Sequence, residues 1–197
     1  MIGDPPAYAA LSDGALMVLF ANGDPGASRV LAARLLPRAL RHAARVLGDR
    51  AEAEDVAQEA MLRLWRAAAG WQQDGAAQPA TWLYRVVANL CTDRLRRSGR
   101  TASLEDADQA RDGQPGVEDR LIEKGRMAAL DAALAHLPDR QRQAVVLRHI
   151  EGLSNPEIAA ILDLGVEAVE SLTARGKRAL AQALANSKEA LGYDDGP

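Results

Sequence analysis

Two groups of side chains in the first half of the sequence have the types and spacing needed to bind other macromolecules. In the first group, Asp55, Gln58 and Glu59 share a helical spacing with Leu62. Carboxylate and amide groups around an apolar side chain suit a partner protein that carries arginines. The alternative is an ordinary solvated helix face, and no histidine or cysteine stands nearby to complete a metal site.

The second group has the chemistry to bind unpaired nucleic acid and consists of Trp71, Trp82, Tyr84, Arg85 and Asn89. Aromatic faces stack on unpaired bases, arginines hold the backbone, and an amide can hydrogen-bond an exposed base edge. Trp82 also fits the core face of an amphipathic helix, and that alternative is at least as strong for this residue.

Charge is distributed unevenly along a chain whose formal net charge is −3. Residues 81–100 contain five arginines, among them Arg94, Arg96 and Arg97, against a single aspartate. Residues 101–122 contain six acidic residues against two arginines, with Gly113, Pro115 and Gly116 among them. These patterns predict a basic surface followed by a flexible acidic linker.

The composition favours helices, because 48% of the 197 residues are hydrophobic, only 4% are aromatic, and no stretch alternates strictly between apolar and polar residues. We predict an all-α fold in which two small helical domains, 10–100 and 122–187, are joined by the acidic linker 101–121. In the first domain, helices are expected before the turn 22–26 and over 27–47, 53–68 and 81–97. Pro37 is expected to kink or split the second of these helices.

The second domain has the outline of a helix-turn-helix. Ser154 and Glu157 have the spacing of a capping box, and 163–165 form a turn that contains Gly165, before a helix with basic residues toward its end. The alternative is an ordinary helical hairpin. The side chains of Arg175, Lys177 and Arg178 could reach phosphates without reading base sequence.

Several function classes lack support in this sequence. We expect no catalytic residues, no metal site and no cofactor, because the three histidines are scattered and no nucleophile stands in a hydrolase motif. The single cysteine, Cys91, excludes an internal disulfide, and its apolar surroundings favour packing over redox sensing. No apolar run approaches a membrane span, so a cytoplasmic protein without membrane insertion is expected.

Two motifs of the first domain and one of the second together resemble a known family. Asp55-Val56-Ala57-Gln58-Glu59 precedes a Trp-Leu helix, 82–89, that ends with Asn89 and is followed by Asp93 to Arg97, and the second domain contains Gly152-Leu153-Ser154. Between about Leu11 and Leu184 the chain resembles the extracytoplasmic-function sigma factors, compact members of the sigma-70 family of bacterial transcription initiation factors.

The resemblance implies three binding surfaces. The core RNA polymerase, through the clamp coiled coil of its largest subunit, would meet Asp55, Gln58, Glu59 and Leu62, and its flap would be a further contact. The minus-10 promoter element would meet Trp71, Trp82, Arg85, Asn89, Arg94, Arg96 and Arg97. The minus-35 element would meet Glu167, Glu170, Ser171, Thr173, Arg175, Lys177 and Arg178. An anti-sigma factor is implied as a further partner, and the acidic linker would lie in polymerase channels that otherwise carry RNA.

The sequence departs from the family in the recognition helix. Glu170-Ser171-Leu172 stands where the family often has a basic residue, Ser and Arg. Because a glutamate can accept a hydrogen bond from the amino group of cytosine, we hypothesise that minus-35 specificity depends on Glu170 and on the basic helix end. The runner-up interpretation is a helix-turn-helix regulator that binds duplex DNA without polymerase, although the tryptophan-rich loop and Asn89 have no role in major-groove recognition.

Overall fold

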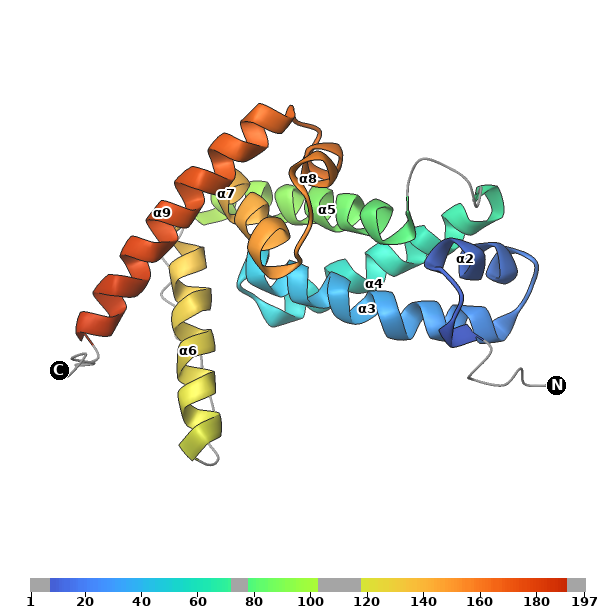
Figure 1. Cartoon of the computed structure of the whole chain (residues 1–197), viewed down its shortest axis with the longest axis horizontal. Helices are drawn as coiled ribbons and strands as arrows, with labels where there is room; N and C mark the ends of the chain where they lie inside the picture. The colour runs from blue at the N-terminus through green and yellow to red at the C-terminus, as the bar shows by residue number, and fades with distance from the viewer. Residues whose placement is uncertain (1–7, 72–77, 103–117, 191–197) are drawn as a thin grey trace.

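The computed structural model describes residues 8–71, 78–102 and 118–190, and within them the predicted all-α fold is confirmed. The first half contains α2 (Asp13–Ala21), α3 (Pro25–Leu47), α4 (Arg50–Ala67), the 3₁₀ turn η1 (Ala68–Gly70) and α5 (Pro79–Ala102). The second half contains α6 (Glu118–Ala135), α7 (Asp139–Val145), the π-helical turn η2 (Val146–Ile150), α8 (Asn155–Leu162) and α9 (Val166–Ala190). Helices α3, α4 and α5 pack along one another, while α6 and α9 project from one end of the molecule (Figure 1).

The predicted linker, 101–121, lies mostly outside the described residues. Helix α5 runs on to Ala102, past the expected end near Arg97, and α6 begins at Glu118. The predicted loop before α5 likewise falls largely on residues 72–77, which are not described.

Side-chain caps fix the short turns of the first half. Ser12 accepts a hydrogen bond from the Ala15 amide (3.2 Å) at the start of α2. Asp24 accepts from the amides of Gly26 and Ala27, and its pKa is lowered mainly by the second of these bonds. These carboxylate and hydroxyl oxygens satisfy amides that have no partner within the first helical turn.

Pro37 lies inside α3, which is unbroken from Pro25 to Leu47, so the helix is not split there, and a kink at this residue stays a prediction. The proline is on the exposed side of the helix, where the carbonyl that loses its amide partner can bond to water. The opposite side of α3 carries the fully buried Leu31, Leu35, Ala39 and Val46.

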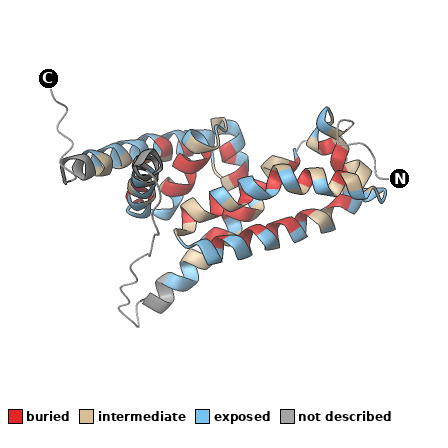
Figure 2. Cartoon of the chain, turned by 90° about the horizontal axis from the view of Figure 1, so that it is seen from below, coloured by how far each residue is buried: buried red, intermediate tan, exposed pale blue. Residues whose placement is uncertain are grey.

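The core of the first half is built from aliphatic side chains and alanines on the facing sides of the helices, where the buried positions gather (Figure 2). Leu16, Leu35, Leu64 and Val87 are fully buried there. Cys91 is buried as well, and this burial raises the pKa of its thiol to about 12. The packing interpretation of the cysteine is therefore confirmed, because a neutral buried thiol is a poor nucleophile.

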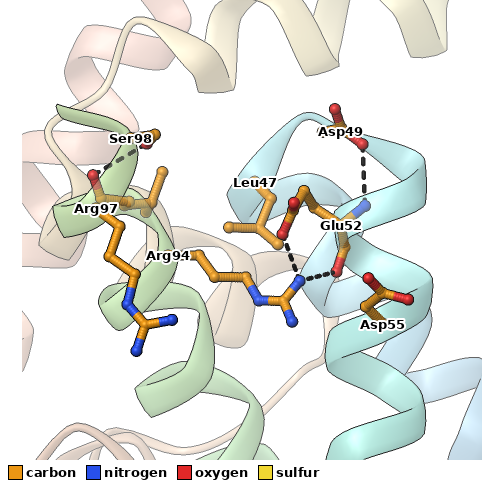
Figure 3. Close-up of a pocket in the computed structure, with 8 residues that line it drawn as sticks. Leu47, Asp49, Glu52, Asp55, Arg94, Arg97 and Ser98 are labelled. Atoms are coloured by element: carbon orange, nitrogen blue, oxygen red, sulfur yellow. Dashed lines mark hydrogen bonds and ion pairs between the residues drawn. The ribbon is translucent and has the colours of Figure 1, made fainter. Parts of the chain in front are cut away.

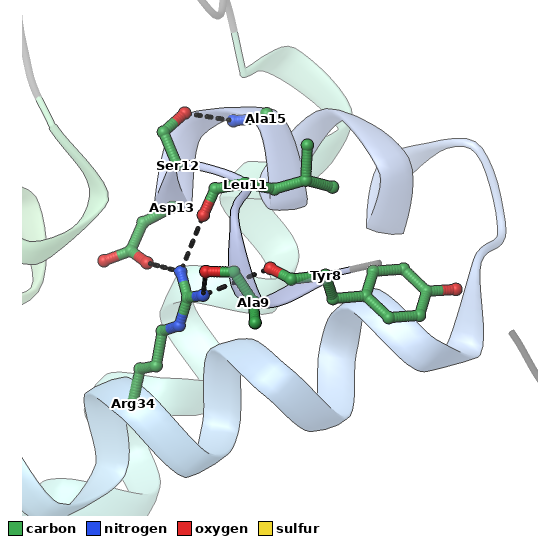
Figure 4. Close-up of polar contacts among 7 residues, drawn as sticks. All are labelled: Tyr8, Ala9, Leu11, Ser12, Asp13, Ala15 and Arg34. Carbon is green, nitrogen blue, oxygen red and sulfur yellow. Dashed lines mark hydrogen bonds and ion pairs between the residues drawn. The ribbon is translucent and has the colours of Figure 1, made fainter. Parts of the chain in front are cut away.

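Arg34 anchors the chain ahead of α2 to the middle of α3. Its guanidinium donates to the carbonyl oxygens of Tyr8, Ala9 and Leu11 and pairs with Asp13 at 3.0 Å (Figure 4). One side chain thus binds three backbone carbonyl oxygens, and the Tyr8 carbonyl also accepts the Leu11 amide at 3.1 Å.

In the second half, the predicted capping box is present: the Ser154 hydroxyl faces the Glu157 amide, and the Glu157 carboxylate accepts from the Ser154 amide at 2.8 Å. Helix α7 packs closely on α9 at Gly176, where an added Cβ would lie 2.5 Å from a methyl carbon of Val145. The close approach of these two helices therefore requires glycine at this position.

The two halves are packed against each other. Tyr84 and Ala88 of α5 form one buried cluster with Leu147, Ile158 and Val169 of the second half. Polar contacts add to it: Gln143 donates to the Thr92 hydroxyl at 3.0 Å, and Arg45 lies 4.0 Å from Asp131. The second half is consequently held on α3 and α5 rather than joined to the first half by the linker alone.

His42 lies fully buried beside this contact, with its ring edge-on to Tyr84 at 5.7 Å between centroids. Neither ring nitrogen has a hydrogen-bond partner among the described residues. Burial lowers the pKa of His42 from 6.5 to about 4, so the imidazole is neutral in the folded protein.

His42→Leu should make the protein less sensitive to acid. Between pH 7 and pH 5 the unfolded chain binds a proton at position 42 and the folded chain does not, so wild type loses about 2 kcal/mol of stability from this group. Denaturant unfolding at both pH values measures the loss of stability, and the loss in the leucine variant should be smaller by the contribution of His42. An equal loss in both proteins would contradict the buried neutral imidazole.

The turn between α8 and α9 gives a second test of the fold. The left-handed residue is Asp163 (φ 55°), whereas Gly165 has no positive φ and open space around its Cβ position. Gly165→Ala should therefore change the stability by less than about 0.5 kcal/mol. The less flexible unfolded chain favours alanine, whereas the N-cap position, where the Gly165 carbonyl accepts from the Val169 amide, favours glycine. Thermal unfolding measures the change, since a turn that needed a left-handed residue at Gly165 would lose about 1 kcal/mol.

Candidate functional site

The outer face of α4 carries the residues expected to meet a protein partner. Asp55, Gln58 and Leu62 are exposed, and Leu62 retains 49% of its accessible surface despite being a large apolar residue. Glu59 is half-buried and accepts a hydrogen bond from Arg63 at 2.8 Å, which lowers the pKa of its carboxyl. The face is thus an apolar side chain surrounded by ionised and amide groups.

Two adjoining hollows lie between this face and α5, and Asp55, Arg94 and Arg97 line both of them. Arg94 points toward α4, where its guanidinium donates to the Glu52 carbonyl at 3.0 Å and forms an ion pair with the Glu52 carboxylate (Figure 3). Arg94 was predicted to lie near DNA phosphates, but in this structure it joins α4 to α5.

The aromatic residues lie where α5 begins. The rings of Trp71 and Trp82 meet edge to face, with centroids 6.5 Å apart, and both side chains are half-buried against the core. Arg85 and Asn89, by contrast, are exposed on α5. Trp82 therefore packs on the core and keeps part of its side chain exposed, while its contact with a base stays a prediction.

At the far end of α5, Arg96 and Arg97 are exposed. Arg96 forms an ion pair with Asp93 one turn earlier, at 3.1 Å. Pairs of this kind on an exposed helix surface contribute little to stability, so the guanidinium can exchange its partner at small cost.

In α9 most of the predicted contact residues share the outward face. Exposed members are Glu167, Glu170, Ser171, Arg175, Lys177 and Arg178. Thr173 is a correction: it is 8% exposed, and its hydroxyl donates to the carbonyl oxygens of Val169 and Glu170 in its own helix. Its side chain therefore packs inward and has no donor left for a DNA base.

One contact of the recognition helix was missed by sequence reasoning. The side-chain amide of Asn155, in the first turn of α8, donates through Nδ2 to the Glu170 carboxylate at 3.3 Å. The side-chain carbonyl oxygen of Asn155, Oδ1, is buried without a hydrogen-bond partner among the described residues. An asparagine at a helix start signals a cap, and nothing in its spacing indicates a contact with the next helix.

The contacts between the two halves were also missed. Glu151 accepts a hydrogen bond from the Tyr84 hydroxyl at 2.5 Å, and Arg142 donates to the Val46 carbonyl at the end of α3 at 2.6 Å. Both residues lie in segments predicted as helix or turn of the second domain, and helical periodicity carries no information on contacts between domains.

Other kinds of site find no support in the described ranges. No group of histidine, cysteine and carboxylate side chains there could hold a metal ion. None of the helices described is both long and apolar enough to cross a bilayer.

Comparison with known proteins agrees with this arrangement. Residues 31–101 match the family model for Sigma-70 region 2, and residues 127–180 match that for Sigma-70, region 4. The ECF RNA polymerase sigma factor SigE of Mycolicibacterium smegmatis is 38% identical over 154 residues, which cover 75% of this chain and 58% of that protein. The match therefore spans less than two thirds of that relative's own length.

Two further relatives are matched over more of their length. The RNA polymerase sigma-H factor of Pseudomonas aeruginosa is 31% identical over 173 residues, covering 83% of this chain and 89% of that protein. The solved structure of CnrH in complex with the cytosolic domain of CnrY aligns with a TM-score of 0.63 and 30% identity, covering 88% of this chain and 97% of that one. With both helical halves matched in the order of regions 2 and 4, the chain belongs to the sigma-70 family, among its extracytoplasmic-function members.

Proposed function

We propose that this chain is a promoter-specificity subunit that directs core RNA polymerase to a set of promoters and has no catalytic activity of its own. The observation that carries the proposal is the presence of three exposed surfaces on a chain of this family: the α4 face, the start of α5 and the outward face of α9. Such a protein acts in the cytoplasm, where the polymerase and the chromosome are.

The α4 face is the proposed polymerase contact. Leu62 is one of the few large apolar side chains that are exposed among the described residues, and Asp55, Gln58 and Glu59 surround it. An apolar centre with a charged rim is the arrangement in which one buried side chain contributes most of the binding energy. The clamp coiled coil of the largest polymerase subunit is the expected partner.

The start of α5 is the proposed minus-10 surface. Trp71 and Trp82 offer partly accessible rings. Arg85 and Asn89, one helical turn apart on α5, offer exposed hydrogen-bond donors. Stacking and backbone contacts of this kind suit unpaired bases, as required when the promoter is melted. Arg96 and Arg97 extend the basic surface toward flanking phosphates.

The outward face of α9 is the proposed minus-35 surface. Its first turns are acidic at Glu167 and Glu170, and its basic residues come later in the helix. The Asn155 contact holds the Glu170 carboxylate in one orientation. A carboxylate held in this way can accept a hydrogen bond from the amino group of a base, in addition to repelling phosphates.

An anti-sigma factor is the proposed regulator. CnrH, whose structure this chain resembles, was solved in complex with the cytosolic domain of CnrY. A partner of that kind would inhibit this chain by covering its polymerase-binding and promoter-binding surfaces. The alternative of a regulator that binds duplex DNA without polymerase predicts no use for the α4 face.

In vitro transcription from a library of promoters, with core polymerase and with or without the chain, tests the proposed function. Transcripts should appear only when the chain is present.

Leu62→Ala should weaken binding to the core polymerase about tenfold, because a central apolar contact is lost. Leu36→Ala is the matched control, since Leu36 is an exposed leucine (39%) on α3, outside the proposed contact. Tight duplex binding without chain-dependent initiation would support the stand-alone regulator instead.

The base preference of the recognition helix is a separate prediction. Glu170→Gln should lower the preference for cytosine at one minus-35 position by about fivefold or more and favour adenine there, since glutamine pairs with adenine. Asn155→Ala should broaden the preference at that same position. A promoter library read by sequencing measures both, with the minus-10 preference as the internal control. An unchanged minus-35 profile in both variants would reject a role for Glu170.

A further inference from the structure

Glu151 is a buried carboxylate at the contact between the two halves. It follows η2, and only 3% of its side chain is exposed. One oxygen, Oε2, accepts from the Tyr84 hydroxyl at 2.5 Å and lies 3.5 Å from a guanidinium nitrogen of Arg41. The other oxygen, Oε1, is buried without a hydrogen-bond partner in the described part of the chain. Burying a charged group with one oxygen unsatisfied costs free energy, so packing alone does not account for a carboxylate here.

The groups around this carboxylate belong to the first half of the chain and form a site for an anion. Arg41 comes from α3, Tyr84 comes from α5, and Arg38 stands one helical turn before Arg41. Burial, followed by the hydrogen bond to Glu151, raises the pKa of Tyr84, so its hydroxyl remains a donor. A hydroxyl donor beside guanidinium groups is a common way to hold a phosphate oxygen.

This anion site lies on the side of α5 that adjoins the exposed side carrying the proposed surface for unpaired DNA. Arg85 follows Tyr84 directly and is exposed, and Asn89 lies one helical turn further along α5. The Tyr84 ring, now covered by Leu147 and Ile158 in the buried cluster, offers a face on which a base could stack. A strand lying along α5 would therefore reach the tyrosine and Arg41 if the second half moved away.

Such a movement is required by the length of a promoter. The minus-10 and minus-35 elements of a promoter, centred about 25 base pairs apart, are separated by about 85 Å of B-form DNA. In this structure the halves that would bind them are in direct contact through α5 and α8. The contact at Glu151 must then break when both elements are bound, which leaves Arg41 and Tyr84 without their carboxylate.

We propose that Glu151 occupies a phosphate-binding site of the first half, formed by Arg41 and Tyr84, and that single-stranded DNA takes its place when the two halves separate. The carboxylate stands in for a phosphate and keeps the free protein closed. The inference rests on the proposed function for its DNA ligand, and its test uses no polymerase.

Fluorescence anisotropy with a labelled 20-nucleotide mixed-sequence strand and the full chain tests the proposal. Glu151→Gln keeps the size of the side chain and removes its charge, so it should tighten strand binding about fivefold. Arg41→Ala, at a side chain that is 53% exposed, should weaken binding by about as much. Arg29→Ala, at another exposed arginine of α3, is the matched control and should change affinity less than about twofold.

The double variant separates a shared site from simple closure. If Glu151 and a phosphate compete for Arg41, the gain from Glu151→Gln should fall below about twofold when Arg41 is alanine. If Glu151→Gln raises the affinity for the strand just as much when Arg41 is alanine, the contact between the halves only blocks access of the strand, and the phosphate site is rejected. Affinity for a 20-base-pair duplex should stay within about twofold in Glu151→Gln, because α9 is exposed in the closed form.

Failure here and failure of the proposed function are distinguishable. Chain-dependent transcription together with unchanged strand binding in Glu151→Gln and Arg41→Ala would reject this site alone. Strand binding that follows the pattern above without any transcription would leave the site intact and reject the sigma function. Circular dichroism of each variant confirms that the helices are retained, and Arg41→Ala gives a second, independent answer if Glu151→Gln unfolds.

Discussion

A buried guanidinium at the contact between the two halves joins the ends of two helices. Arg142 is 8% exposed and donates to the carbonyl oxygens of Val46 at the end of α3, Ala135 at the end of α6, and Leu137 just after it. Helix C-termini leave carbonyls without amide partners and carry partial negative charge, so a cation that joins two of them removes unsatisfied acceptors from both. Burial lowers the pKa of Arg142, but an arginine remains charged under any ordinary condition, which makes this anchor independent of pH.

Around that anchor the contact is mixed in character, and this mixture suits an interface that has to open. Ala88, Leu147 and Ile158 exclude water, whereas Gln143, Glu151 and Arg41 make contacts that water or another polar ligand could replace. A purely apolar contact would expose a large hydrophobic patch on opening, and a purely polar one would hold the halves only weakly. The α4 face and the outward face of α9 lie away from the contact, so closure leaves both of them exposed.

Local features of the fold could be predicted from sequence because their causes are local. The start of α2 at Ser12, the capping box at Ser154 and the burial of Cys91 each follow from a few neighbouring residues. The choice between a kinked and a split helix at Pro37 could not be made from sequence, because the cost of the proline depends on whether the freed carbonyl meets solvent or core, which only packing decides. Thr173 was expected on the outward face of α9 but is buried, and the pairing of Arg94 with Glu52, 42 residues earlier in the chain, was not expected. Contacts at that separation follow from the tertiary arrangement, and helical periodicity contains no trace of them.

Acidic side chains near the proposed DNA surfaces explain how a chain with a net charge of −3 could avoid binding DNA indiscriminately. Non-specific affinity grows with the number of phosphates that lysine and arginine neutralise. In this protein Arg94 is paired with Glu52, Arg96 with Asp93, and Arg41 with Glu151, so much of the positive charge is already neutralised within the chain. A strand must displace these carboxylates before it gains the arginines, which lowers its affinity for the free protein. Binding to polymerase, which would supply further contacts to DNA, then becomes the condition under which the exchange is favourable.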